Sequence, residues 1–379
     1  MLYYHRARGA LSLRSRQAGA ESAPDAVWMH LRDEATTRMK RVLVFNFFAG
    51  VMERGIPLYA QNLAECMRRV GFEPVEIRCP VWLHRWPRWA RNIGFVLFEQ
   101  IAAPVLGLLR GCSLAVYPYN SVRIVDSLLG RAVMVVHDLI PNRRHSLAAR
   151  YICVAQAVHR WIGGRVCAAS EHTLTHLRRL PAFKRCALAL WSNPFYSFES
   201  ELAWRAAPTR RDTNDPPRVV LCSGMGRYKD YSGALRLFAR SAALRGAELR
   251  VIGFGDDAPL AARRVQRLPA DVRRRITLLP RLALKDLITE YLASDVVWVH
   301  SKKEGFGRCV VEGRLCGRPV VASDIGAFRK FASFGVHLYR REKFDAAMSH
   351  ALERAPTANL SSVAYHASLE AVVSEVVGA

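Results

Sequence analysis

The chain has 379 residues, of which 51% are hydrophobic, so it can fill the cores of two domains of ordinary size. Its 56 lysines and arginines exceed its 32 acidic residues and give a formal net charge of +24, which indicates an anionic partner such as an acidic lipid surface or a phosphorylated substrate. The basic residues form no arginine-rich arm and no zinc-finger spacing, so a nucleic acid is not the expected partner.

The nine cysteines include no C-x-x-C pair, which is typical of a reducing compartment. The N-terminus lacks a continuous apolar core ahead of a cleavage site, so no signal peptide is expected. The most apolar stretch, residues 93–110, contains Glu99, Gln100 and Pro104, and we expect these to interrupt it too often for it to span a bilayer. We therefore predict a cytoplasmic protein that can rest on the inner face of the membrane.

The first predicted elements follow an extension without strand pattern. Residues 1–38 are rich in Arg, Ala and Ser and are expected to be disordered. Residues 42–45 read as a buried strand, and a glycine-containing loop and an amphipathic helix follow as far as Gly71. Another strand begins at residue 73. Strand, helix and strand in this order predict the βαβ unit of a parallel sheet.

The same alternation continues through "SLAVYPYN", "AVMVVHDLIP" and "GGRVCAAS", and it predicts a Rossmann-like domain over residues 39–196. The polar, proline-punctuated residues 197–217 are expected to be a linker. A second Rossmann-like domain over residues 218–358 is predicted from "RVVLC", "ELRVI", "RITLL", "DVVWV" and "RPVVAS". A last helix within residues 359–379 either caps this domain or returns to the first.

Two carboxylates stand where one predicted strand of the second domain ends. Glu304 lies in the exit loop of the strand, and Glu312 lies one turn into the next helix, which starts near Arg308. Gly305 and Gly307 allow backbone N–H groups to approach a ligand, and the helix N-terminus favours an anion. A carboxylate beside an anion site suits hydroxyl groups, so this loop predicts binding of a sugar linked to a phosphate.

The segment "EGFGRCVVEGRLCGRPVVASDIG" resembles the E-x7-E segment of the retaining glycosyltransferases of family 4 (glycosyl transferases group 1). The resemblance implies the GT-B fold, in which two Rossmann-like parallel-sheet domains face each other across a cleft. It places Glu304 against the donor sugar and Glu312 on the ribose of the nucleotide. It also assigns the backbone of Gly305, Phe306 and Gly307 to the sugar and diphosphate. The alternative is a helix-start loop with one exposed glutamate and one satisfied in the core.

The same resemblance covers two further loops of the second domain. In "SGMGRYKDY" it assigns Arg227 and Lys229 to the diphosphate of the donor, although their spacing is shorter than the commonest form in the family. A solvated basic pair is the alternative. In "VIGFGDD" it assigns main-chain contacts with the nucleotide to Gly253 and Gly255.

In the first domain, "VVHDLIP" places His137 and Asp138 at the carboxyl end of a buried strand. The resemblance implies that this pair contacts the sugar, and the histidine can also reach the reacting phosphate oxygen. The loop "ERGIP" resembles the glycine-rich loop of the family, but Arg54 and Pro57 replace glycines there. Only Gly55 therefore carries over as a donor-binding residue.

The resemblance implies transfer of a hexosyl group, by analogy a mannosyl or related sugar, from a nucleotide-diphosphate sugar to a saccharide or lipid-linked acceptor of surface polysaccharide or glycolipid assembly. Glu304 and His137 are the expected catalytic residues. The sequence has no D-x-D motif, so we expect neither a metal nor a cofactor beyond the donor. Two alternatives stay open: a nucleotide-dependent oxidoreductase, which needs a G-x-G-x-x-G turn, and a non-catalytic basic protein that binds nucleotides or anions.

Residues 84–98 interleave Trp86 and Trp89 with arginines. Indole rings favour the boundary between headgroups and acyl chains, and arginines attract acidic lipids. The first domain is therefore expected to make peripheral contact with an anionic membrane. The alternative is that the tryptophans belong to the core and the arginines form a solvated face.

Overall fold

The computed structural model describes residues 39–49, 55–139, 147–205, 215–254, 257–280, 282–353 and 363–378. The chain divides into two units, residues 1–39 and residues 40–379, and the fold below is that of the second unit. The predicted extension 1–38 lies outside the described residues.

The first domain is built on a six-stranded parallel sheet with the order β2-β1-β3-β4-β5-β6. Its central strands are continuous apolar runs, which is expected of a parallel sheet covered on both faces. The strands are β1 (Arg41–Phe45), β2 (Glu73–Ile77), β3 (Leu114–Tyr117), β4 (Ala132–Val136), β5 (Arg165–Ala168) and β6 (Ala187–Leu190).

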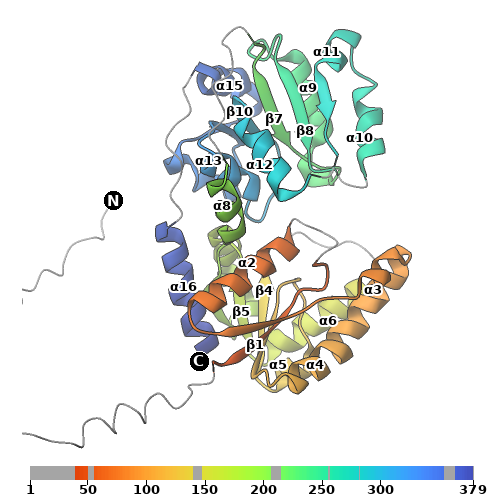
Figure 1. The fold of residues 1–379 in the computed structure, drawn as a ribbon, viewed down its shortest axis with the longest axis vertical. Coiled ribbons are helices and arrows are strands. Elements are labelled where there is room, and N and C mark those ends of the chain that lie inside the picture. The colour runs from red at the N-terminus through yellow and green to blue at the C-terminus, as the bar shows by residue number, and fades with distance from the viewer. Residues whose placement is uncertain are drawn as a thin grey trace, which may run out of the picture. The chain divides into compact units, whose positions relative to one another are not determined.

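Helices cover both faces of this sheet. Side chains alternate between the two faces along each strand, so a continuous apolar run presents apolar side chains on both sides. Val42 and Val44 pack toward α2 and the C-terminal helix α16 (Val363–Gly378), whereas Leu43 and Phe45 pack toward α3, α4 and α6 (Figure 1). The helices are α2 (Ile56–Arg69), η1 (Val81–Arg85), α3 (Arg88–Leu97), η2 (Phe98–Ala102), α4 (Ala103–Leu109), α5 (Ile124–Leu128), α6 (Leu147–Trp161), α7 (Glu171–Arg179) and η3 (Pro181–Phe183).

The second domain repeats the plan with the strand order β12-β11-β10-β7-β8-β9, again all parallel. The expected fold class, two parallel-sheet α/β domains, is confirmed. The strands are β7 (Arg218–Cys222), β8 (Glu248–Ile252), β9 (Ile276–Leu278), β10 (Val296–Val299), β11 (Val320–Ser323) and β12 (Val336–Tyr339).

One face of the second sheet carries α8, α12, α13 and α14, and the other carries α9, α10, α11 and α15. The alternation is clear on β10, where Val297 and Val299 face the first group and Trp298 faces the second. The helices are α8 (Tyr196–Ala203), η4 (Arg227–Lys229), α9 (Tyr231–Arg240), α10 (Ala258–Val265), α11 (Ala270–Arg274), α12 (Leu284–Leu292), α13 (Arg308–Leu315), α14 (Gly326–Arg329), η6 (Ala332–Phe334), η7 (Arg341–Lys343) and α15 (Phe344–Glu353).

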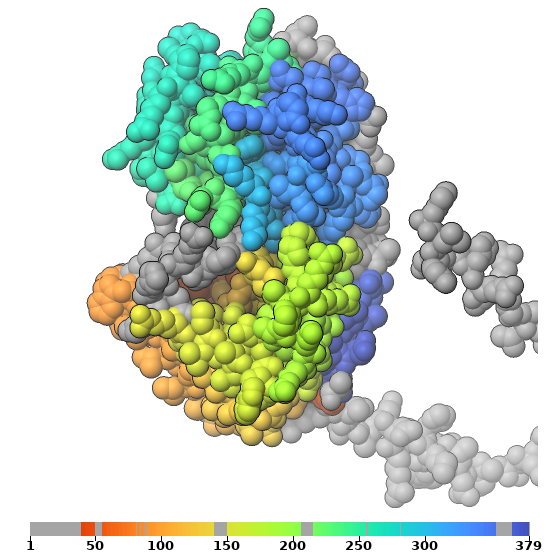
Figure 2. All heavy atoms as spheres, turned by 180° about the vertical axis from the view of Figure 1, so that it is seen from behind, coloured from red at the N-terminus to blue at the C-terminus, as the bar shows by residue number. Residues whose placement is uncertain are grey.

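Two connecting segments differ from the expected boundaries. Residues 197–203, predicted as the start of a linker, belong to helix α8, because Phe198 is fully buried in the core of the second domain. Helix α16 returns to the first domain, where Leu369, Val373 and Val377 join the core beneath α2. Figure 2 shows this dark blue helix beside the lime-coloured part of the first domain.

Residues 88–109 form one continuous helical segment made of α3, the π-helical turn η2 and α4. The expected interruption by Glu99, Gln100 and Pro104 is wrong, because the π turn accommodates the proline, which has no N–H to donate. Among the described residues, Trp89–Leu109 is long enough and apolar enough, by length and composition alone, to cross a membrane. Within it, 28% of the most apolar 18-residue stretch is buried.

Candidate functional site

The loop between β10 and α13 packs against the end of β4 in the first domain. Ser170 Oγ donates to the carbonyl oxygen of Gly305 at 2.7 Å, and Thr173 Oγ1 donates to that of His137 at 3.0 Å. A Cβ atom at Gly305 would lie 2.2 Å from the His137 carbonyl oxygen and 3.0 Å from Asp138 Cβ. Glycine is therefore required at position 305 for the carboxyl ends of the two sheets to meet. The structure brings His137, Asp138 and Gly305 together.

Glu304 and Lys229 form the centre of this site. Lys229 Nζ lies 2.5 Å from Glu304 Oε1, and the glutamate side chain is 15% exposed. Desolvation acts to lower the pKa of Lys229, but the Glu304 carboxylate outweighs it and the pKa is raised. The result is a fixed ion pair that joins the loop after β10 to η4, which follows β7.

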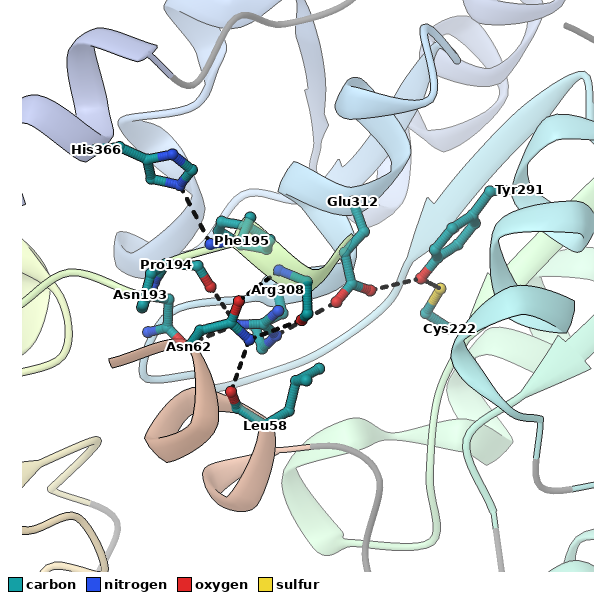
Figure 3. Close-up of polar contacts among 11 residues, drawn as sticks. Leu58, Asn62, Asn193, Pro194, Phe195, Cys222, Tyr291, Arg308, Glu312 and His366 are labelled. Atoms are coloured by element: carbon teal, nitrogen blue, oxygen red, sulfur yellow. Dashed lines mark hydrogen bonds and ion pairs between the residues drawn. The ribbon is translucent and has the colours of Figure 1, made fainter. Parts of the chain in front are cut away.

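Glu312 is buried on α13, and two neighbouring side chains donate hydrogen bonds to it (Figure 3). Tyr291 donates its hydroxyl to Glu312 Oε2 at 3.1 Å, and Arg308 Nε donates to Oε1 at 3.3 Å. Cys222 Sγ lies 3.4 Å from the same tyrosine hydroxyl. These contacts fit the alternative in which Glu312 is satisfied within the core. They also fit a ligand-binding role, because a carboxylate can accept further hydrogen bonds.

Arg308 was missed as a site residue. Its guanidinium donates from Nη1 to Asn193 Oδ1 at 3.4 Å and to the Pro194 carbonyl oxygen at 3.2 Å, and it lies 4.3 Å above the ring of Phe195. Figure 3 shows it between Glu312 and the segment that precedes α8. Its Nη2 atom is buried and makes no hydrogen bond within the described part of the chain. The sequence could have identified Arg308 by its spacing of four residues from Glu312 on one predicted helix.

The two neighbours of this loop have different roles. Gly307 begins α13 with φ of 89°, and a Cβ atom there would lie 2.2 Å from the ring of Phe328, so glycine is required twice over. The side chain of Phe306 is buried against Phe195 and Phe331. Only the backbone of Phe306 can therefore serve a ligand.

A second glycine loop follows β8 and lies against the end of β7. Gly253 has φ of 110°, and a Cβ atom there would lie 2.2 Å from the Ser223 carbonyl oxygen. The Ser223 hydroxyl is buried and makes no hydrogen bond within the described residues, which leaves it available to a ligand. Gly255 lies outside the described residues.

Two predicted donor-binding residues stand apart from this cluster. Arg227 is exposed and forms no ion pair with any residue that the structure describes, so it is not joined to Glu304 as Lys229 is. Gly55 begins α2 with φ of 73°, and no atom lies within 4 Å of the position of a Cβ there. Its open surroundings leave room for a ligand, while Arg54 lies outside the described residues.

His137 is held in one tautomer. One of its ring nitrogens, Nε2, lies 2.8 Å from the Pro118 carbonyl oxygen, which can only accept, so this nitrogen carries the proton. Desolvation, with a smaller contribution from the nearby Arg308 charge, lowers the pKa of His137 to about 4. The ring is therefore neutral at physiological pH, and its Nδ1 atom is an acceptor. An acceptor suits a sugar hydroxyl rather than a phosphate oxygen.

The residues that the structure describes include no group of three His, Cys, Asp or Glu side chains able to hold a metal ion. Groups with positive charge or N–H donors gather at this loop: Lys229, the Arg308 Nη2 atom that makes no hydrogen bond, and the first N–H groups of α13.

Comparison with known proteins places the resemblance in the second domain. Residues 216–355 match the sequence profile of the family "Glycosyl transferases group 1". The D-inositol 3-phosphate glycosyltransferase of Mycobacterium sp. strain KMS is 34% identical over 113 residues, 29% of this chain and 26% of that protein. The enzyme of the same name from Mycolicibacterium smegmatis is 30% identical over 160 residues, 40% of this chain and 37% of that protein. The matched region thus spans 26% to 37% of the length of these relatives.

Solved structures extend the likeness to both domains at the level of fold. HepE of Anabaena, solved with UDP and glucose, has a TM-score of 0.57 at 16% identity, covering 89% of this chain and 94% of that one. The sucrose-phosphate synthase of Thermosynechococcus elongatus has a TM-score of 0.58 at 18% identity with the same coverage. The chain has the GT-B fold, as the sequence predicted.

Proposed function

We propose that the protein is a glycosyltransferase that moves a hexosyl group from a nucleotide-diphosphate sugar to a saccharide or lipid-linked acceptor. One observation carries this proposal: Glu304 and Lys229 are paired at the carboxyl ends of β10 and β7, beside the N-terminus of α13 and against the end of β4. A carboxylate for sugar hydroxyls and a cation for diphosphate then stand side by side at the junction of two sheets. The profile match over residues 216–355 supports the assignment.

The reaction breaks the bond between the anomeric carbon and the diphosphate oxygen and forms a bond from that carbon to an acceptor hydroxyl. The proton of the hydroxyl passes to the departing diphosphate. Lys229 has three donors, so it can keep its bond to Glu304 and still stabilise the negative charge that develops on the leaving group. Glu304 orients the sugar and stabilises positive charge at its anomeric carbon, as a front-face, retaining route requires.

His137 and Glu312 would fix the two ends of the donor. The neutral His137 ring accepts a hydrogen bond from a sugar hydroxyl through Nδ1, since Nε2 is committed to Pro118. Glu312 accepts from the ribose hydroxyls with the lone pairs left by Tyr291 and Arg308. Neither residue acts as a covalent nucleophile in this scheme.

The acceptor side is proposed to face a membrane surface that contains acidic lipids. Trp89, Ile93, Leu97, Ile101 and Val105 recur every four residues along α3, η2 and α4, and each is between 44% and 68% exposed. We call this set the apolar row. Side chains four apart wind round an ideal α-helix by about 40° per step. The π turn η2 takes up an extra residue and so keeps the row on one side.

The helix that carries the apolar row is better suited to lie on a bilayer than to cross it. Its inner side is packed on the sheet, with Phe95 and Ala103 buried and Gly107 so close to β1 that a Cβ there would lie 2.6 Å from Leu43 Cδ1. The exposed arginines Arg85 and Arg110 flank it at its two ends. An amphipathic helix with basic flanks inserts its apolar side at the lipid interface.

The transfer reaction is tested by incubating the purified protein with UDP, GDP, dTDP and ADP sugars. We expect one nucleotide series to raise the melting temperature and its sugar form to be slowly hydrolysed. Saturable NAD(P) binding with hydride transfer would instead establish an oxidoreductase. Nucleotide binding without turnover of any sugar form, with acceptors added, would establish a non-catalytic binding protein.

Lys229→Ala tests the placement of the donor. Because the lysine would contact only the diphosphate, binding of the nucleoside diphosphate should weaken by about tenfold or more, with little change for the nucleoside. Glu353→Gln, at the exposed end of α15 in the same domain, is the control and should leave both affinities unchanged. Equal losses for diphosphate and nucleoside would show that Lys229 is structural.

Vesicle co-sedimentation tests the membrane surface. The wild-type protein should sediment with vesicles that contain phosphatidylserine at low salt, should be released by high salt, and should not sediment with purely zwitterionic vesicles. Protein that stays in the supernatant with acidic vesicles at low salt would exclude this surface and indicate a soluble acceptor, without bearing on the donor site.

A further inference from the structure

A pocket of about 420 Å³ opens on the side of the second sheet opposite to Glu312. It lies at the carboxyl ends of β10, β11 and β12, between these strands and the start of α9. His300 lines it and stacks with Tyr339, while Trp298, two residues earlier on the same side of β10, packs with α9 and α15. The Glu312 cluster packs on the other side, with α12 and α13. The pocket is therefore separate from the proposed donor site.

The lining of this pocket is positively charged. Four basic side chains, those of Arg236, Lys302, Arg340 and Arg341, stand against two carboxylates, those of Asp230 and Asp324, which leaves two positive charges in excess.

Two of the four basic side chains form ion pairs with the carboxylates of the pocket. Lys302 pairs with Asp230 at 2.9 Å, and Arg340 pairs with Asp324 at 3.3 Å. Arg236 and Arg341 have no carboxylate partner among the residues that the structure describes. The two unpaired guanidinium groups are the natural contacts for an anion, because they form charge-assisted and often bidentate hydrogen bonds with phosphate.

A buried donor completes the lining. Trp298 Nε1 donates to the Tyr339 hydroxyl at 2.9 Å, and that hydroxyl lies beside His300 Nδ1. When the tyrosine donates its single proton to Nδ1, His300 carries its own proton on Nε2. Nε2 is buried and makes no hydrogen bond within the described residues, although Asp230 Oδ2 is 3.6 Å away. Asp230, its charged neighbour, is paired with Lys302, so the Nε2–H group lies at the wall of the pocket without a hydrogen bond to any described residue.

The wall between this pocket and the proposed donor site consists of two loops that are bonded to each other. Lys302 N donates to the Tyr228 carbonyl oxygen at 2.7 Å, and Ser301 Oγ donates to the same oxygen at 2.9 Å. The same two loops carry Lys229 and Glu304. A ligand in the pocket would therefore touch, from behind, the loops that hold the donor-site ion pair.

We propose that this pocket binds the phosphate group of a small phosphorylated molecule, through Arg236, Arg341 and the Nε2–H of His300, at a site distinct from the donor site. Its volume lies toward the lower end of the range of small-molecule pockets, about 300–1,000 Å³, and leaves room for a phosphate monoester with a small polar body. The proposal does not depend on the transfer reaction.

The test is calorimetric titration of the full chain with inorganic phosphate and with glycerol 3-phosphate. Wild type should bind at least one of them saturably at a single site. The double variant Arg236→Ala/Arg341→Ala should bind about tenfold more weakly or worse, because two charge-assisted contacts are lost. Both arginines are exposed, so the variant should melt as wild type does.

Two control variants make the outcome decisive. Arg240→Ala/Arg263→Ala removes the same charge from exposed positions on α9 and α10 outside the pocket and should keep the affinity within about twofold. Lys229→Ala should also keep it. Equal weakening in the first control would show attraction by net charge alone, and loss of binding in Lys229→Ala would place the phosphate in the donor site. Either result, or the absence of saturable binding, would overturn the proposal.

Discussion

In the second domain, charged side chains gather at the carboxyl ends of the strands, where Lys229 pairs with Glu304 and Arg308 pairs with Glu312. In the first domain, the carboxyl ends supply the neutral His137, while an apolar row lies exposed along an outer helix. The two domains share a scaffold of six parallel strands. The scaffold therefore sets where loops can meet, whereas the side chains on loops and outer helices decide what each domain binds.

The first domain also buries a carboxyl group that the second does not match. Glu99, in the π turn beneath the apolar row, is fully buried, and Ser121 and Tyr151 donate to its Oε2 atom. Its Oε1 atom has no partner within the described residues. Burial raises the pKa of Glu99 to about 7 despite these hydrogen bonds. Glu304 and Glu312 of the second domain each pair with a basic side chain, whereas Glu99 has hydroxyl groups as its hydrogen-bond donors.

The largest effect is expected for Glu304→Gln. This change keeps the size of the side chain and removes the charge that faces Lys229 and, as we propose, the reacting sugar. Loss of one oriented electrostatic contact in an active site typically lowers the rate by about 10²–10³. We expect that loss in the transfer rate with an unchanged melting temperature. Near-normal turnover would refute the role of Glu304, with Glu353→Gln as the charge-matched control.

Glu99→Gln tests how the buried carboxyl group makes the stability of the first domain depend on pH. The folded-state pKa of about 7 lies above the ordinary 4.5, so Glu99 contributes stability that is fully present below about pH 4.5 and is lost as pH rises through 7. The shift corresponds to about 3 kcal/mol. In urea unfolding, the free energy of unfolding of the wild type should therefore be lower at pH 8 than at pH 5. The difference should be smaller in the variant. The same pH dependence in both proteins would contradict the raised pKa.

The apolar row is tested by Leu97→Ser/Ile101→Ser. Each change removes an exposed aliphatic side chain that we place in the lipid interface. A loss of about 1 kcal/mol for each partly inserted side chain corresponds to roughly thirtyfold weaker partitioning into acidic vesicles. Trp204→Ala removes a tryptophan that is 87% exposed and outside the row, and it should sediment as wild type does. Equal losses in both variants would mean that apolar exposure in general, and not the row, drives association.

The smallest effect is expected for His137. Because its pKa is about 4, its ring stays neutral between pH 5.5 and 8. His137→Gln should lower kcat/KM by about tenfold, the value of one lost hydrogen bond to the substrate, and by the same factor at both pH values. A ratio between variant and wild type that changes severalfold around pH 6.5 would show that the histidine titrates and acts as an acid or base.

The sequence by itself determined the features that are local in the chain. The central strands of both sheets were predictable because a strand buried on both faces must be a continuous apolar run. The Glu304 loop was predictable because strand, glycines and helix start are adjacent in sequence. The edge strands β6 and β12 were missed, since each pairs with only one neighbour and carries partly exposed positions that weaken the apolar pattern.

Only the tertiary structure decided which distant residues meet and which surfaces stay uncovered. Nothing near Arg308 in the sequence indicates Asn193, and nothing near Gly305 indicates Ser170, because both contacts join different domains. The sequence also left open where α16 packs, and it could not show that the apolar row is exposed. Periodicity identifies an apolar side of a helix, but whether that side meets a core or solvent depends on the elements that pack around it.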